Sequence, residues 1–477
     1  MTPGPHHLHH RPVHRGRTLF VLFLALEFFQ LSRQIWISLL GDFVAPIATA
    51  SNGLAAPVLV ASAWHYAHAY PHRLIARARR WIVTLATTCT VLFIYGVCYR
   101  HLYFFEALED YSVYLIIMSG VVLGAIPQFW RDAFGPLFWC FACGLLLNGL
   151  AMLDYATVSS AVGGDGTRIA ARDTMAYKAQ LVLGFWMLLL MTSPLRRRTQ
   201  VFTILAGVGF VFLQALLFQQ RLPSAFVMAN ALVFLWLVRL ARRRRELSAR
   251  KPNFALLLIV IAGLAPLTAA IVAPATFNTQ AQALILRFRG LGPGLDYSNG
   301  IFSVLTVENE RAKIVGECFS SFTVTDWILG RGMGGAYEWS GSWDLAGRSD
   351  LEEQTYYLPD AKFYGRRSFE VGFLMPALKG GILLMAVLYY GPLVLLWRNR
   401  RVMRPNLFTQ AATACVVGSL VYSVMGGNFL LAAVYMLTSW SLCLGWCLSR
   451  DRNTNPLQLP KPGAPAPLPK FPARSHA

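Results

Sequence analysis

The stretch Asp326-Trp-Ile-Leu-Gly330-Arg-Gly332-Met-Gly334 lies near the middle of residues 275–370, the only long polar segment in an otherwise apolar chain. The 477 residues are 55% hydrophobic and only 14% charged. Soluble domains are about one-quarter charged, so this composition predicts a membrane protein. A polar interruption of this length between apolar segments is expected to have a function of its own.

Apolar segments of about 17 to 25 residues follow one another on both sides of this polar segment. We therefore expect an all-α polytopic membrane protein with about twelve transmembrane helices and the large polar loop between the ninth and tenth. The expected spans are residues 18–40, 48–70, 81–99, 111–129, 134–153, 177–193, 201–218, 224–240, 254–274, 372–397, 408–426 and 429–448.

Five regions follow from this layout. The expected regions are a disordered tail (1–17), spans one to nine (18–274), the polar loop (275–370), spans ten to twelve (371–449) and a Pro-rich disordered tail (450–477).

The formal net charge of +20 is concentrated in short basic runs between apolar segments. These runs are residues 73–80, 196–198, 242–245 and 398–404. Basic runs of this kind are typical of the cytoplasmic loops of membrane proteins. They therefore indicate how the protein is oriented in the membrane, and this explanation is favoured over nucleic-acid binding. Both termini are then expected in the cytoplasm, with the polar loop on the opposite side of the membrane.

The polar loop is rich in arginine. It contains Arg287, Arg289, Arg311, Arg331, Arg348, Arg366 and Arg367, but only two lysines, Lys313 and Lys362. Arginine grips phosphate with two parallel hydrogen bonds and stays charged, which favours a phosphate-bearing ligand. The alternative for Arg311 is a surface pair with Glu308 on a solvated helix. Lys178, at the outer end of the sixth span, either reaches the same phosphate or extends its amine to the membrane surface.

The glycines of the loop suit the same ligand. Thr325-Asp326 is expected to cap a short turn that ends at Gly330, and Gly332 and Gly334 come directly after it. Glycine lets backbone amides approach an anion closely. Glu370 is expected at the start of the tenth span, where a carboxylate complements the positive end of a helix.

Together these features resemble the O-antigen polymerase (Wzy-type) and O-antigen ligase superfamily of bacterial inner-membrane glycosyltransferases. The layout of spans and loop is similar over most of the chain. Glu310-Arg311 with the 326–334 stretch is similar to the family's R…LG-x-G-x-G segment. The stretch from Glu370 to Gly381 is similar to the family's start of the helix after the loop.

The resemblance implies a GT-C-like fold and a chemistry that needs no metal and no cofactor. The donor is an undecaprenyl-diphosphate-linked oligosaccharide and the acceptor is a sugar hydroxyl. Fixed cations stabilise the charge that grows on the departing diphosphate. Arg311 is the first candidate for this contact; the further candidates are Arg331, Arg366, Arg367, Arg287 and Arg289.

One departure separates two functions within this family. The ligases carry a histidine at the start of the helix after the loop, whereas this sequence has Glu370 there and no histidine between His101 and His476. The resemblance thus implies that Glu370 serves as the base for the acceptor hydroxyl or orients the acceptor. The absence of the histidine favours a polymerase that joins repeat units into an exopolysaccharide or O-antigen. A ligase, and a lipid-linked oligosaccharide flippase or other transporter, remain the alternatives. A chain-length regulator and a flippase of the same pathway are the implied protein partners.

Overall fold

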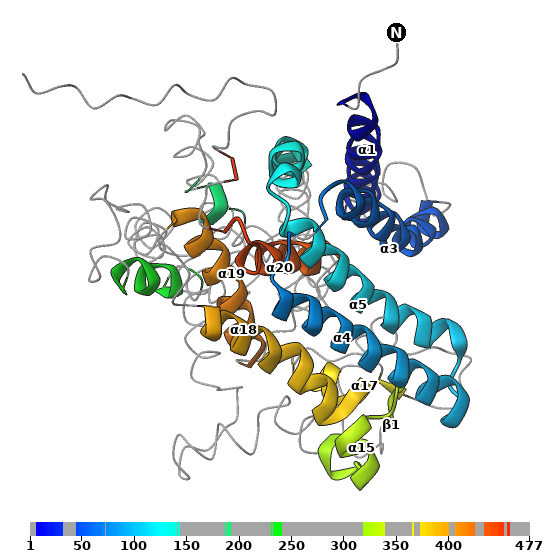
Figure 1. Ribbon diagram of the computed structural model, residues 1–477. Coiled ribbons are helices and arrows are strands. Elements are labelled where there is room, and N and C mark those ends of the chain that lie inside the picture. Colours follow the sequence, from blue (N-terminus) through cyan, green and yellow to red (C-terminus); the bar gives the residue numbers. More distant parts are fainter. Residues whose placement is uncertain are drawn as a thin grey trace, which may run out of the picture.

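The computed structural model describes a helical protein with one very short pair of strands (Figure 1). The residues described are 6–31, 44–71, 73–140, 142–143, 186, 188–190, 192, 230, 232–240, 318–338, 365–366, 373–399, 406–424, 434–452 and 456–457. The expectation of a mainly α-helical fold is confirmed in this part of the chain.

The elements are named as in Figure 1. The N-terminal half contains α1 (His6–Leu31), α3 (Val44–Ala69), α4 (Ala76–Ile94), the π-helical turn η1 (Tyr95–Tyr99) and α5 (Phe104–Gly124). The polar loop contains α15 (Val324–Leu329), β1 (Tyr337–Glu338) and β2 (Gly365–Arg366). The C-terminal part contains α17 (Leu374–Met385), the π-helical turn η3 (Ala386–Tyr390), α18 (Gly391–Asn399), α19 (Leu407–Val424) and α20 (Val434–Cys447).

Three helices in the described part are long and apolar enough to cross a membrane: Ala76–Tyr99, Phe104–Gly124 and Leu374–Asn399. They coincide with the third, fourth and tenth expected spans, which are confirmed as helices of membrane-crossing length. The expected seventh and ninth spans, 201–218 and 254–274, lie outside the described residues.

Three helix boundaries differ from the expected ones: both ends of α5 and the start of α1. α5 begins at Phe104, so Glu106, which was expected in a loop, lies in its first turn, where a carboxylate complements the positive end of the helix dipole. α5 ends at Gly124, and a new helix begins at Pro127, because proline fits the first turn of a helix but not its interior. At the N-terminus, α1 begins at His6, within the region expected to be an unstructured tail.

α4 packs antiparallel to the α17–α18 region, beside α5 (Figure 1). Near the start of α4, the Trp81 indole Nε1 donates to the Val387 carbonyl at 2.8 Å. Near its end, Leu92 lies against Gly380, where an added Cβ would come within 2.5 Å of Leu92 Cδ1. The two contacts, one near each end of α4, set the register of α4 against this region.

α5 and α20 approach closely because small residues face each other. An added Cβ at Gly120 would lie 2.8 Å from Ser441 Cβ, and one at Gly445 would lie 3.0 Å from Gly124 Cα. Both helices therefore present two small residues spaced four apart. This spacing lets helix backbones meet in a membrane, where packing rather than the hydrophobic effect drives association.

The start of α4 and the end of α20 meet at one end of the helices. Leu74 forms an isolated antiparallel bridge with Ser449, and Arg73 Nη1 lies 2.9 Å from Asp451 Oδ2. These segments were both expected on the cytoplasmic side, and the structure brings them together. The polar-loop residues lie near the opposite end of α4, at Leu92 and Gly96.

α17 is not a continuous helix. Gly381 has φ 56° and ψ −153°, which breaks the helix between residues 374–380 and the segment that starts at Ile382. The φ value requires glycine, because other residues rarely adopt it. The expected tenth span therefore consists of a short helix that faces the polar loop, followed by the long apolar helix.

Candidate functional site

α15 begins with a reciprocal pair of hydrogen bonds. The Thr323 hydroxyl accepts from the Asp326 amide at 3.2 Å, and the Thr323 amide donates to Asp326 Oδ2 at 3.1 Å. This is a capping box, with Thr323 as N-cap and Asp326 at the third helical position. Asp326 takes part in the cap as expected, but its partner and the N-cap residue is Thr323 and not Thr325.

Residues 330–336, here called the glycine loop, turn back from α15 onto the membrane helices. Gly330, Gly332 and Gly334 all have positive φ, at 64°, 86° and 85°. An added Cβ at Gly332 would lie 2.7 Å from Gly96 Cα in η1, and one at Gly330 would lie 2.6 Å from the Leu378 carbonyl oxygen. These glycines allow the loop backbone to approach two helices closely.

Three amides of the glycine loop donate to acceptors in α17, α4 and α5. The Arg331 amide donates to the Leu378 carbonyl at 2.7 Å, and the Met333 amide donates to the Leu92 carbonyl at 3.3 Å. The Gly334 amide donates to Asp110 Oδ2 at 2.6 Å. The anion held by the loop backbone in this structure is therefore a carboxylate of the protein itself.

A buried ion pair anchors the glycine loop to α5 and α17. Lys379 is fully buried, and its Nζ lies 2.6 Å from Asp110 Oδ2 and 2.6 Å from the Gly335 carbonyl oxygen. Asp110 thus accepts from both Lys379 and the Gly334 amide. In a dry environment a buried charge needs such partners, and these tie three segments together.

A second ion pair anchors α15. The Arg100 guanidinium pairs with Asp326, which is itself nearly buried. Arg100 Nε also donates to the Tyr95 hydroxyl at 2.9 Å, and the Tyr95 ring stacks on Tyr99 with centroids 5.3 Å apart. This pair connects the polar loop to the turn between α4 and α5.

Arg331 is the candidate phosphate ligand whose side chain the structure describes. Its Nη1 donates to the Ala336 carbonyl at 2.9 Å and its Nη2 donates to the Ser321 hydroxyl at 3.0 Å. The side chain is partly exposed. Guanidinium has five N–H groups, so these two bonds orient it and leave donors that can face a ligand.

The strand pair brings a second candidate segment to the glycine loop. β1 comes directly after the loop, and its Tyr337 is opposite Arg366 of β2 in the antiparallel register. The structure thus places the Arg331 and Arg366 segments side by side, although they are far apart in the sequence. The other candidates lie outside the described residues: Arg311, Arg367, Arg287, Arg289, Lys178 and Glu370.

Asp110, Lys379 and Arg100 were not among the expected site residues. Lys379 is the single charged residue between Val371 and Trp397, and an ionisable group inside an apolar segment usually has a partner or a function. This signal is in the sequence and could have identified Lys379. Nothing in the sequence indicates its partner, Asp110.

The thiol of Cys318 lies beside Leu374 and Leu378 in a small apolar cluster at the base of α15. Burial raises the pKa of the Cys318 thiol to about 12, and the Arg331 charge lowers this pKa only in part. The thiol is therefore protonated at neutral pH, which does not suit a nucleophile.

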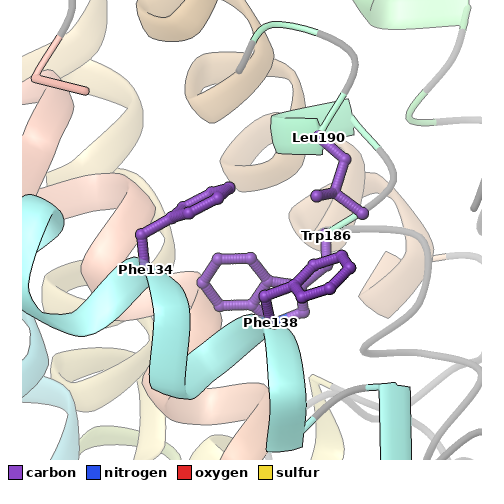
Figure 2. A pocket seen from close by; sticks show the side chains of 4 residues that line it. All are labelled: Phe134, Phe138, Trp186 and Leu190. Atoms are coloured by element: carbon purple, nitrogen blue, oxygen red, sulfur yellow. The ribbon is translucent and has the colours of Figure 1, made fainter. Parts of the chain in front are cut away.

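Figure 2 shows a small pocket elsewhere in the described part of the chain, lined by Phe134, Phe138, Trp186 and Leu190. The indole N–H of Trp186 already donates to the Ser439 hydroxyl at 3.2 Å. The lining is otherwise carbon, so this pocket does not suit a phosphate or a sugar. Within the described ranges, no cluster of three or more His, Cys, Asp or Glu side chains could hold a metal ion.

Comparison with protein-family models and with curated proteins gives no match to this sequence. The fold and the site together define a helical protein with helices of membrane-crossing length and a polar loop fixed to one end of them.

Gly332→Ala is expected to destabilise the protein by about 1–3 kcal/mol, because alanine at φ 86° is strained and its Cβ would collide with Gly96. The matched control is Gly135→Ala, in the helix that starts at Pro127, where an added Cβ meets nothing within 4 Å. That change should be neutral or slightly stabilising. Thermal unfolding midpoints in detergent compare the two variants; equal midpoints would contradict the close contact between Gly332 and η1.

Proposed function

We propose that this protein is a metal-independent glycosyltransferase that joins undecaprenyl-diphosphate-linked oligosaccharide repeat units into an exopolysaccharide or O-antigen. It works at the periplasmic face of the bacterial inner membrane, with both of its termini in the cytoplasm. The proposal combines the family resemblance of the loop motifs with the arrangement of that loop on apolar helices.

The observation that supports this proposal most is the anchoring of the glycine loop. Arg331 lies in a loop whose backbone is hydrogen-bonded to Leu92 and Leu378, near one end of helices long enough to cross a membrane. If these helices cross the membrane, a guanidinium held at this end of them would lie close to the headgroups, where the diphosphate of a membrane-bound lipid is expected. Two intramolecular hydrogen bonds orient Arg331 before a ligand binds, and such preorganisation strengthens electrostatic stabilisation.

In the proposed reaction, the bond between the donor sugar and the lipid diphosphate breaks while an acceptor hydroxyl attacks the sugar. Arg311, Arg331, Arg366 and Arg367 would stabilise the charge that develops on the departing diphosphate. Glu370 would accept the proton of the attacking hydroxyl. Arginine suits this role better than lysine, since its planar fork binds two phosphate oxygens at once.

A transporter would be expected to have internal repeats and interrupted helices at matching positions in two halves. The sequence has no evident repeat of this kind. The break at Gly381 is an interrupted helix of this kind, and it is the structural feature that favours the flippase alternative. The ligase alternative differs from the polymerase only in its acceptor.

The experiment that tests the proposal is deletion of the gene, followed by analysis of lipid-linked glycans. A polymerase predicts single repeat units that accumulate on undecaprenyl diphosphate at the periplasmic face, and restoration of polymer when the gene is returned. Finished chains without an acceptor would identify a ligase instead. Repeat units that remain on the cytoplasmic side would identify a flippase, and an unchanged glycan profile would reject all three.

A further inference from the structure

α15 presents an apolar face to the outside of the protein. Val324, Trp327 and Ile328 are spaced three and four residues apart, so they lie on one side of the helix. They are 78%, 40% and 54% exposed, whereas Asp326 on the opposite side is buried. A polar loop in water would not be expected to expose such a face.

The same face lies next to exposed apolar side chains of the neighbouring long apolar helix. The Ile328 backbone packs on Gly381, where an added Cβ would lie 2.5 Å from the Ile328 carbonyl carbon. The next two residues after Gly381, Ile382 and Leu383, are exposed at the start of the long apolar helix. Figure 1 shows α15 beside this end of α17.

Helix geometry gives the depth in a bilayer at which α15 contacts Gly381. The helix from Gly381 to Arg398 rises about 26 Å, at about 1.5 Å per residue. The helix from Arg80 to Gly96, which contacts the glycine loop, rises about 24 Å by the same measure. The hydrocarbon core of a bilayer is about 30 Å thick. With Arg80 and Arg398 at the opposite surface, Gly381 and Gly96 lie about 4 and 6 Å inside the far edge of the hydrocarbon core, a distance of roughly one helical turn.

Aromatic side chains gather at the same end. Trp327 stacks on Phe319 with ring centroids 4.8 Å apart, and Phe319 lies 6.4 Å from Phe373. Tyr99 and Tyr103, in the turn between α4 and α5, are 72% and 78% exposed. Tryptophan and tyrosine are enriched where hydrocarbon meets the headgroups.

We propose that α15 is a membrane-interface helix whose face of Val324, Trp327 and Ile328 contacts the lipid acyl chains of the leaflet on the glycine-loop side. The anchored helix then holds Arg331 close to the boundary between hydrocarbon and headgroups. This inference depends on the membrane helices and not on the proposed chemistry.

The test uses full-length protein with Cys98 and Cys143, the two exposed cysteines, replaced by serine. An environment-sensitive fluorophore is attached to Ile328→Cys, and the protein is placed in vesicles of phosphatidylethanolamine and phosphatidylglycerol. Lipids brominated on the acyl chains quench a probe in the hydrocarbon, and aqueous iodide quenches a probe in water. Ile382→Cys gives the lipid reference and Ser320→Cys, at an exposed polar position, gives the aqueous reference.

The probe at 328 is expected to lose as much emission to brominated lipid as the probe at 382, and little to iodide. A probe at Val324→Cys, on the same face, is expected to show the same quenching by brominated lipid and by iodide. Agreement between the two positions excludes misfolding of a single variant as the cause. Quenching at both positions by iodide, as at 320, would overturn the proposal. Protection from both quenchers would also overturn it, because the face would then be covered by protein, such as a second copy.

Discussion

Replacing Lys379 with methionine is expected to lower the stability of the protein by about 3–5 kcal/mol, the cost of removing one partner from a buried ion pair. Asp110 would keep only the Gly334 amide as a described hydrogen-bond donor, and the Gly335 carbonyl would lose the Lys379 ammonium. The measurement is the thermal unfolding midpoint of the purified protein in detergent, together with its yield in the membrane.

A second variant separates the unpaired charge from the loss of packing. Lys379→Met combined with Asp110→Asn leaves no charge without a partner, and the side-chain oxygen of the introduced asparagine can still accept from the Gly334 amide. The double variant should therefore be more stable than Lys379→Met alone. If the double variant is equally unstable, the ion pair does not anchor the glycine loop in the way described.

A second ion pair, between Arg73 and Asp451, is more exposed to solvent and serves as a matched control. Arg73 and Asp451 lie 2.9 Å apart, but their side chains are 35% and 31% exposed. Surface ion pairs contribute about 0–1 kcal/mol, so Arg73→Met should change the midpoint little. The comparison distinguishes the effect of burial from that of a charge pair in general.

The helical class and the three helices of membrane-crossing length could be predicted from the sequence, because hydropathy and length determine them. The break at Gly381 could not, because hydropathy does not report a backbone angle, and the residues on both sides are apolar. The ion pair between Asp110 and Lys379 could not be predicted from the sequence either, because the two residues are far apart in the chain.

The capped turn that ends at Gly330 and the part of Asp326 in its cap were predicted correctly, but the N-cap residue was not. Thr323 and Thr325 are both suitable N-cap residues, and the choice between them depends on the side chain three positions later. With Thr323 as cap, Asp326 falls at the third position and returns a hydrogen bond. With Thr325 as cap, that position would be Ile328, which has no side-chain acceptor. For the glycines, the sequence predicted that backbone amides would approach an anionic ligand; the structure shows that the positive φ values let the loop pack on Gly96 and Leu378.

Arg311→Ala is expected to abolish polymer while the amount of protein in the membrane stays the same. Arg311 is the first candidate for the diphosphate contact, although it lies outside the described residues. Removing one preorganised donor to a developing negative charge costs about 10²–10³-fold in turnover. The measurement is the chain-length distribution of the glycan when the variant is returned to the deletion strain.

Two further variants sharpen this test. Arg311→Lys keeps the charge but loses the planar fork, so short chains in reduced amount are expected. Arg348→Ala removes an arginine from the same polar loop that is not among the site candidates, and it should leave polymer length and yield unchanged. If Arg348→Ala also abolished polymer, the loop would depend on its overall charge and not on a specific contact.

The result that would reject the proposed role is polymer of normal length and yield from Arg311→Ala. In that case the diphosphate would have to be held by other cations, and Arg331 in the glycine loop is the next candidate. Because the Arg331 side chain is bonded to Ala336 and Ser321, its replacement changes the loop as well as the charge. Arg331 variants therefore need the stability measurement beside the polymer assay, and a loss of polymer at unchanged stability would assign the contact to Arg331.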